Sequence, residues 1–305
     1  MNFQKEVSKL GLCETYKGSI DIFKSGRYLL EPKLDGIRCI MFVFPEVSKV
    51  YSFSRNGKKL YNMDIIEQEV LALCKDFSQL FVFKNSSSLV LDGELFAKDW
   101  SLTSSIVHTH KEHPDKSHLS YYIFDIVSLP DWLESKATPS LLERKSALSW
   151  LFKQAGENVP HLVNVPYVIP GSLSEAKDLL EQLLSKGYEG AVVKDGLSPY
   201  PFSRSSSWLK WKPVKTIDVE VIEVKQGTGR NKNRLGSFIC KLQNGKTFRV
   251  GGGFTDTQRE EFWHKRNELI GCIVEVEYQE ETIHGVPRFP RFVRIRWDKS
   301  KKEVE

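Results

Sequence analysis

The sequence predicts an α+β domain over residues 1–213, followed by a small all-β domain over residues 214–305. In the first part, short apolar strands alternate with amphipathic helices and long loops, which is typical of a mixed α+β domain rather than a regular βαβ repeat. After Pro213 the strands follow one another across short turns, and only one helix interrupts them. A length of 305 residues with 40% hydrophobic content is sufficient for two separate cores.

The first domain contains three segments in which apolar residues recur at helical spacing. We expect these helices at Asp64–Phe77, Leu141–Gln154 and Ser174–Lys186. The third carries a stripe of four leucines, and Gly187 directly after it is the typical residue for ending a helix.

The second domain is expected to contain five strands, with one helix between the third and the fourth. The strands are Val219–Lys225, Phe238–Gln243, Thr247–Gly251, Ile273–Gln279 and Phe292–Trp297, and the helix is Thr257–Asn267. Asn244-Gly245 is a strong hairpin signal between the second and third strands. This order is that of an OB barrel, a fold that commonly grips nucleic acid. The short stretch Lys212–Thr216 is the expected hinge.

Composition indicates a soluble protein that makes no contact with a membrane. The five cysteines are scattered without a C-x-x-C pair, which favours a reduced compartment and disfavours a zinc module. The first residues lack the apolar stretch of a signal peptide, and no later run approaches bilayer-spanning length. The formal net charge is +5, and the part from Lys215 onward has 18 Lys and Arg against 14 Asp and Glu. The smaller domain therefore carries most of the positive excess.

One short segment, Lys33-Leu34-Asp35-Gly36-Ile37-Arg38, suggests chemistry. A lysine amine attacks phosphorus only in a site that depresses its pKa and gathers phosphate oxygens. An extended chain places Lys33 and Asp35 on one face, Gly36 permits a tight turn, and Arg38 offers a fork for phosphate. Alone, such a hexad is more typical of an exposed strand end.

Further charged or aromatic groups follow the hexad in order, each beside an expected strand. They are Ser54-Arg55-Asn56-Gly57, Leu91-Asp92-Gly93-Glu94-Leu95, Tyr121-Tyr122-Ile123-Phe124-Asp125, Glu189-Gly190-Ala191-Val192-Val193-Lys194, Trp208-Leu209-Lys210-Trp211-Lys212 and Arg294-Ile295-Arg296-Trp297-Asp298-Lys299. The series resembles the covalent nucleotidyltransferase superfamily of ligases and capping enzymes, and within it a minimal two-domain ATP-dependent DNA ligase of viral, phage or bacterial type. The resemblance spans nearly the whole chain and implies a nucleotidyltransferase (adenylation) domain followed by an OB-fold domain.

The resemblance implies ATP as cofactor and Lys33 as the nucleophile that carries AMP as a phosphoramidate. Glu31 would lie against the adenine, and Phe124 would stack on it. The other nucleotide-binding residues implied are Arg38, Arg55, Glu94, Glu189, Lys210 and Lys212. Among these, Glu94 would hold the ribose, Glu94 and Glu189 would hold Mg²⁺ or Mn²⁺, and the two lysines would contact the α-phosphate.

The resemblance also implies nicked double-stranded DNA as partner, sealed at 3′-OH/5′-phosphate ends through lysyl-AMP and a DNA-adenylate. The implied DNA-binding residues are Arg38, Arg55, Lys225, Arg230, Lys232 and Arg234. Those implied for the pyrophosphate-side chemistry of the OB domain are Arg288, Arg296, Asp298 and Lys299. We expect a monomer located in the cytoplasm or in the nucleic-acid compartment of a host cell.

Three alternatives share part of this pattern. An mRNA capping guanylyltransferase has the lysine chemistry and the Arg-x-Asp-Lys ending but uses GTP, and an RNA ligase has the first domain but typically lacks this barrel. A non-enzymatic binding module would be expected to have lost Lys33 or Glu189, and both are present. The histidines His108, His110 and His113 are expected in a surface or DNA-facing loop rather than at a metal.

Overall fold

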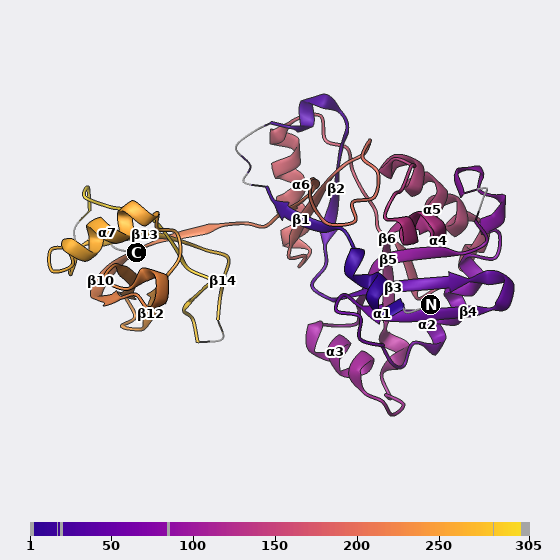
Figure 1. Ribbon diagram of the computed structural model, residues 1–305, viewed down its shortest axis with the longest axis horizontal. Coiled ribbons are helices and arrows are strands. Elements are labelled where there is room, and N and C mark those ends of the chain that lie inside the picture. The colour runs from indigo at the N-terminus through magenta and orange to yellow at the C-terminus, as the bar shows by residue number, and fades with distance from the viewer. Residues whose placement is uncertain (1–2, 17, 19–20, 84–85, 283, 300–305) are drawn as a thin grey trace. The chain divides into compact units, whose positions relative to one another are not determined.

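A computed structural model describes residues 3–16, 18, 21–83, 86–282 and 284–299. The chain forms two compact units, Met1–Trp211 and Lys212–Glu305, each with its own core (Figure 1). The first unit mixes helices with two sheets and the second is a small barrel, so the expected fold class is confirmed. None of the helices in the described ranges has the length and apolar content that crossing a membrane requires.

The first unit contains a five-stranded sheet of order β4-β3-β5-β6-β7, in which only β6 and β7 are parallel. The strands are β3 (Ile37–Phe44), β4 (Lys49–Ser54), β5 (Leu89–Phe96), β6 (Ser120–Ser128) and β7 (Leu162–Asn164). Residues alternate between two apolar clusters along β3, because successive side chains of a strand point to opposite faces. Met41 packs into a cluster with residues of α2 (Asp64–Leu73) and α5 (Leu141–Ala155). Phe42 packs into a second cluster with Trp132 of α4 (Leu129–Glu134), so both faces are covered.

A four-stranded sheet of order β1-β9-β8-β2 forms the other part of this unit. Its strands are β1 (Leu12–Thr15), β2 (Tyr28–Lys33), β8 (Gly190–Asp195) and β9 (Arg204–Trp211). Helix α6 (Leu173–Ser185) buries Ala176 and Leu180 in the same cluster as Leu30 and Val193 of this sheet. The helices α1 (Phe3–Glu6) and α3 (Trp100–His108) complete the unit.

The three helices expected in this unit are confirmed as α2, α5 and α6. Helix α2 ends at Leu73, earlier than the expected Phe77, because the chain turns there and continues as a 3-10 turn, Phe77–Gln79. This turn still buries Phe77 in the core, which explains why the apolar pattern runs past the helix end. Gly187 has a φ of +86°, a left-handed conformation that suits glycine after a helix.

The second unit is a five-stranded barrel of order β12-β11-β10-β13-β16. Its elements are β10 (Lys215–Gln226), β11 (Leu235–Lys241), β12 (Thr247–Val250), α7 (Asp256–His264), β13 (Ile273–Tyr278), the hairpin β14 (Glu280–Glu281) and β15 (Pro287–Arg288), and β16 (Arg291–Ile295). A bridge between Gly252 and Arg291 joins the two edges of the sheet. The neighbouring Gly253 has no room for a side chain, since a Cβ there would lie 2.2 Å from the carbonyl oxygen of Phe292.

The predicted order of strands and helix in the second unit is confirmed, as is the hairpin at Asn244-Gly245, where Gly245 has a φ of +83°. The expected hinge extends too far, because Lys215 and Thr216 already pair with Tyr278 and Glu277 in β10. The strand begins there because β13 is long enough to supply partners for both residues.

Candidate active site

The register between β2 and β8 brings Lys33 and Glu189 together. Lys33 pairs with Gly190, and the backbone N–H of Glu189 donates to the Lys33 carbonyl at 3.0 Å. The Nζ of Lys33 then forms an ion pair with the Glu189 carboxylate, and both side chains are largely buried. An ammonium must release a proton before it attacks an electrophile, and this carboxylate is the base in contact with it. Residues 156 positions apart therefore form one potentially nucleophilic centre.

Lys33 opens onto a cavity of about 120 Å³. The cavity is lined by Cys13, Glu31, Pro32, Lys33, Leu34, Arg38, Glu94, Phe124, Val165, Val192, Lys194 and Trp208. A dry cavity of about 150 Å³ accommodates benzene, so this slightly smaller space has the size of a single flat ring and is too small for a whole nucleotide. The rings of Phe124 and Trp208 meet edge to face, with centroids 6.2 Å apart and an interplanar angle of 83°. The site thus combines an aromatic wall with cations.

A β-bulge gives Phe124 its place in this wall. Asp92 pairs with Asp125 and Gly93 with Ile123, which leaves Phe124 as the extra residue of β6. Gly93 is required there, since a Cβ would lie 2.5 Å from both the ring of Tyr121 and the carbonyl oxygen of Tyr122.

The Glu31 carboxylate, only 2% exposed, lies between two buried lysines at the cavity. Its Oε2 is 2.8 Å from the Nζ of Lys194, and its Oε1 forms an ion pair with Lys145 of α5. The Lys194 ammonium is also 4.4 Å from the ring centroid of Phe124 and 4.3 Å from that of Trp208, within cation–π range. The sequence alone suggests no role for Lys145 or Lys194. Lys194 ends the motif that begins at Glu189, whereas no neighbouring residue in the sequence marks Lys145.

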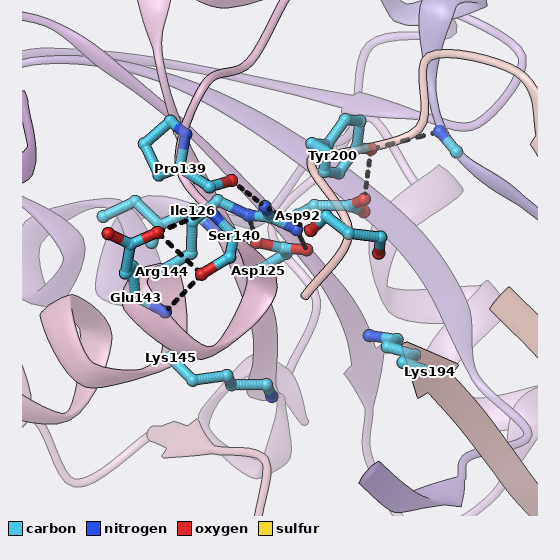
Figure 2. A network of polar contacts seen from close by, with 12 residues as sticks. Asp92, Asp125, Ile126, Pro139, Ser140, Glu143, Arg144, Lys145, Lys194 and Tyr200 are labelled. Atoms are coloured by element: carbon cyan, nitrogen blue, oxygen red, sulfur yellow. Dashed lines mark hydrogen bonds and ion pairs between the residues drawn. The ribbon is translucent and has the colours of Figure 1, made fainter. Parts of the chain in front are cut away.

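Arg38 is held by groups of its own unit. Its Nε and Nη2 donate to the carboxylate of Asp92 at 2.8 and 2.6 Å, and its Nη1 donates to the Gly11 carbonyl at 2.8 Å. Burial alone would lower the pKa of the guanidinium, but Asp92 outweighs it and holds the pKa of Arg38 above its usual value. The hydroxyl of Tyr200 also donates to Asp92, at 2.6 Å (Figure 2). Arg38 lines the cavity, while a contact with DNA stays a prediction.

A second buried pair fixes the strand beside Phe124. Arg144 of α5 donates through Nε and Nη2 to the Asp125 carboxylate at 2.6 and 2.9 Å, and through Nη1 to the Pro139 carbonyl at 2.6 Å (Figure 2). Burial alone would raise the pKa of Asp125, but Arg144 outweighs it and lowers that pKa. Because neither side chain is exposed, this pair anchors α5 to the aromatic wall of the cavity.

Glu94 faces Arg38 across the β3–β5 pair, and burial raises the pKa of its carboxyl to about 7, with Arg38 and Lys33 opposing the rise. The loop containing Gly36 packs directly over it. A Cβ on Gly36 would lie 2.2 Å from the Leu95 carbonyl oxygen and 2.9 Å from Cγ of Glu94. The glycine of the hexad is therefore needed for close approach to β5.

In the described ranges, no three Asp, Glu, His or Cys side chains gather closely enough to hold a metal by themselves. Mg²⁺ usually takes one or two carboxylates and completes its shell with water and substrate phosphates. Lys33 contacts Glu189 and lies close enough to Glu94 to influence its charge. These two carboxylates are therefore suitable ligands for a cation that binds together with a nucleotide.

Two further residues predicted for the first unit, Lys210 and Arg55, differ in where they lie. Lys210 is in β9, where it pairs with Val192. It lies on the same face of the strand as Trp208, because the two residues are two positions apart. Arg55 is exposed in the turn after β4 and does not line the cavity. Lys212 begins the second unit.

A larger hollow of about 940 Å³ lies against other residues of α5. Its charged lining consists of Asp131, Glu134 and Glu143, which disfavours an anionic ligand.

In the second unit, the expected DNA-binding cations are at the surface, and three of the four form ion pairs. Lys225 is 3.5 Å from Glu223, Arg230 is 3.7 Å from Asp256, and Arg234 pairs with Glu260, while Lys232 is exposed.

Of the residues expected on the pyrophosphate side, Arg296 and Lys299 contact Asp218, Asp298 contacts Arg296, and Arg288 lies in the β14–β15 hairpin. Arg296 and Lys299 are 2.8 and 2.7 Å from the Asp218 carboxylate. Arg296 also binds Asp298, which lowers the pKa of that carboxyl.

Two family models match the chain in succession. The model described as ATP dependent DNA ligase domain matches residues 11–212, and that described as DNA ligase OB-like domain matches residues 226–296. This chain belongs to the ATP-dependent DNA ligase family. The family implies ATP and, in general, a divalent metal. Both models describe DNA ligases, which favours this family over capping guanylyltransferases and RNA ligases.

Individual ligases show the same similarity. The DNA ligase of Methanoculleus marisnigri is 28% identical over 97% of this chain and 56% of its own length, and DNA ligase 2 of Methanosarcina acetivorans is 30% identical over 54% and 34%. The chain thus spans less than two thirds of these relatives. The solved structure named Pmar-Lig_PreS3 has a TM-score of 0.74 at 28% identity, covering 94% of this chain and 67% of that one. A Lig E DNA ligase structure, at 24% identity, shares the fold, with a TM-score of 0.64 and coverage of 94% and 99%.

Proposed function

We propose that this protein is an ATP-dependent DNA ligase that seals 3′-OH/5′-phosphate nicks in duplex DNA. The observation that carries the proposal is the Lys33–Glu189 ion pair at the mouth of an aromatic-walled cavity. A lysine at such a position has a base in contact, a site for a flat base beside it, and further cations for phosphate. Family membership narrows this lysine chemistry to ligation.

In the first step, Lys33 releases a proton to Glu189 and its Nζ attacks the α-phosphorus of ATP. A P–N bond forms, the P–O bond to pyrophosphate breaks, and AMP stays on Lys33. Phe124 would stack on the adenine, Glu31 would lie against its edge, and Glu94 would hold the ribose. Lys210 and Lys212 would contact the α-phosphate. Once that proton has passed from Glu189 to solvent, Mg²⁺ or Mn²⁺ held by Glu94 and Glu189 would neutralise phosphate oxygens as charge develops.

In the later steps, the 5′-phosphate of the nick takes AMP from Lys33, and the 3′-OH then displaces AMP to form the phosphodiester. Arg55, which is exposed, would contact the DNA backbone from the first unit, and Lys225, Arg230, Lys232 and Arg234 would contact it from the second. Arg288, Arg296, Asp298 and Lys299 would assist the departure of pyrophosphate. We further propose that the protein acts as a monomer, in the cytoplasm or in a host's nucleic-acid compartment.

Incubation with radiolabelled ATP, GTP or NAD⁺, each with Mg²⁺, followed by a denaturing gel, tests the proposal. We expect an acid-labile adduct that forms readily from ATP, only slowly from GTP and not from NAD⁺. An adduct from GTP alone would indicate capping chemistry, one from NAD⁺ alone a different class of ligase, and no adduct from any of them would contradict the proposal.

A further inference from the structure

Three buried charges from three elements meet beside the cavity, two of them in its lining. Glu31 comes from β2, Lys194 from β8 and Lys145 from α5. The side chains of Glu31 and Lys194 are each 3% exposed, and that of Lys145 is 1% exposed. Each oxygen of the Glu31 carboxylate is assigned to a different lysine, Oε1 to Lys145 and Oε2 to Lys194.

Charge balance does not explain why Lys145 is buried. Lys194 alone neutralises Glu31, and the neighbouring Arg144–Asp125 pair balances itself. A second ammonium therefore adds an excess positive charge in a desolvated place, which is costly. Burial accordingly lowers the pKa of Lys145, although Glu31 opposes the shift. A residue that is unfavourable for stability at this position is more easily explained by function.

Burial and two further neighbours limit where the ammonium of Lys145 can lie. Its Nζ is 3.5 Å from the Val165 carbonyl oxygen and 5.7 Å from the ring centroid of Tyr167. Glu31 and Val165 both line the cavity. With one lysine on each oxygen, the plane of the Glu31 carboxylate cannot turn without breaking an ion pair.

A carboxylate held against position 6 of the ring, and unable to turn toward the N1–H and 2-amino donors of guanine, distinguishes between purine bases. An ionised carboxylate only accepts hydrogen bonds. Adenine carries an amino donor at position 6, whereas guanine carries a carbonyl acceptor at the same position. A site built around a hydrogen bond rejects a ligand that cannot make it far better than a purely apolar pocket rejects an extra group.

We propose that Lys145 is a positioning residue that selects ATP over GTP by holding the Glu31 carboxylate toward the edge of the base. The inference rests on the proposed function, because it requires the cavity to receive the base of ATP. Lys145 acts through Glu31 and touches neither the phosphates nor the attacking amine.

The test uses Lys145→Met in the full chain and measures kcat/KM for formation of the protein–nucleotide adduct with ATP and with GTP. We expect the ratio of the ATP value to the GTP value to fall about tenfold or more. The matched control is Lys153→Met, the same substitution at an exposed position of the same helix, which should leave the ratio unchanged. Lys145→Gln gives a second neutral side chain in case the methionine variant does not fold.

A double-mutant comparison separates positioning from a structural role. In a Glu31→Gln background, Lys145→Met should cause little further change in the ratio, since the residue that it positions is already altered. The inference would be overturned if Lys145→Met lowered kcat/KM by the same factor with ATP and with GTP. It would also be overturned if the effects of Lys145→Met and Glu31→Gln on the ratio were fully additive. Absence of any adduct in the wild-type protein would instead contradict the proposed function itself.

Discussion

The two units hold their charges in different ways. Around the cavity of the first unit, Arg144–Asp125, Lys145–Glu31 and Lys194–Glu31 are almost fully buried. In the second unit, the Arg230–Asp256 pair has side chains 82% and 67% exposed. Breaking a buried pair leaves an uncompensated charge and is costly, whereas an exposed pair contributes little. The difference suggests that the first unit uses fixed charges for chemistry, and that the second unit keeps cations free to exchange a carboxylate for a phosphate.

Asp218 is the exception in the second unit. Its side chain is 9% exposed and lies within 2.8 Å of Arg296 and 2.7 Å of Lys299. These are the cations that the family resemblance assigns to the pyrophosphate-side chemistry. The one buried cluster of charge described in this unit thus coincides with its expected catalytic contribution, which agrees with the rule drawn from the first unit.

The largest effect is expected at Lys33. Lys33→Ala should abolish the ATP adduct, because it removes the amine that lies against the Glu189 carboxylate at the mouth of the cavity. The melting temperature should change little, since the side chain reaches the cavity rather than a core cluster. Gel labelling and thermal denaturation check this, with Lys153→Ala as a control that keeps full labelling. An adduct in Lys33→Ala would show that the nucleophile is misassigned.

The next effect tests the contrast between buried and exposed pairs directly. Arg144→Met leaves Asp125 buried without its partner and should lower the free energy of unfolding of the first unit by about 3–5 kcal/mol. Arg234→Met, which removes a surface pair with Glu260, should cost less than about 1 kcal/mol. Urea denaturation measures both values. If the two variants lost the same free energy of unfolding, the contrast between buried pairs in the first unit and exposed pairs in the second would be wrong.

A pH effect is expected from Glu94. Its folded pKa of about 7 lies above the ordinary 4.5, so the stabilisation linked to its proton is complete below pH 4.5 and is lost as the pH rises through 7. Glu94→Gln should remove this loss, and between pH 5 and 8 the difference in unfolding free energy should move in favour of the variant by about 2–3 kcal/mol. Denaturation in chelator-containing buffer measures it, with the exposed Glu134→Gln as control. If the difference in unfolding free energy between the two proteins does not vary with pH, the pKa of Glu94 is not raised in the folded state.

The smallest effect concerns the exposed cations of the barrel. If about five phosphates are neutralised, log K for nicked duplex should fall against log salt with a slope near −4 to −5. Replacing Arg230 and Lys232 by alanine should reduce the magnitude of this slope by about one to two units and leave adenylation by free ATP intact. Lys75 and Lys153, exposed in the first unit, serve as the paired control. An unchanged slope would show that this loop does not face DNA.

The strand order of the barrel and the three helices were predictable because they depend on local periodicity and turn residues. Lys33 and Glu189, which the structure brings into contact, could be singled out because each lies in one of the ordered motifs that resemble the ligase family. Lys145 was not, since it lies on a helix whose pattern gives no sign that consecutive polar residues, Arg144 and Lys145, are both buried. The ion pairs of Glu31 with Lys145 and Lys194 depend on how α5 packs against β2 and β8. No local sequence pattern predicts that packing. For the same reason, Asp92 as the partner of Arg38 could not be foreseen.

The most direct test of the account is a single-turnover chase of AMP-labelled protein. The purified adduct is mixed with a nicked duplex bearing 3′-OH and 5′-phosphate ends, and with a matched duplex bearing a 5′-hydroxyl. We expect label to leave the protein only with the 5′-phosphate nick, to pass through a DNA-adenylate, and to appear as free AMP as the strand is sealed. Label that stays on the protein with both duplexes, or that leaves equally with both, would contradict the assignment of this site to DNA ligation.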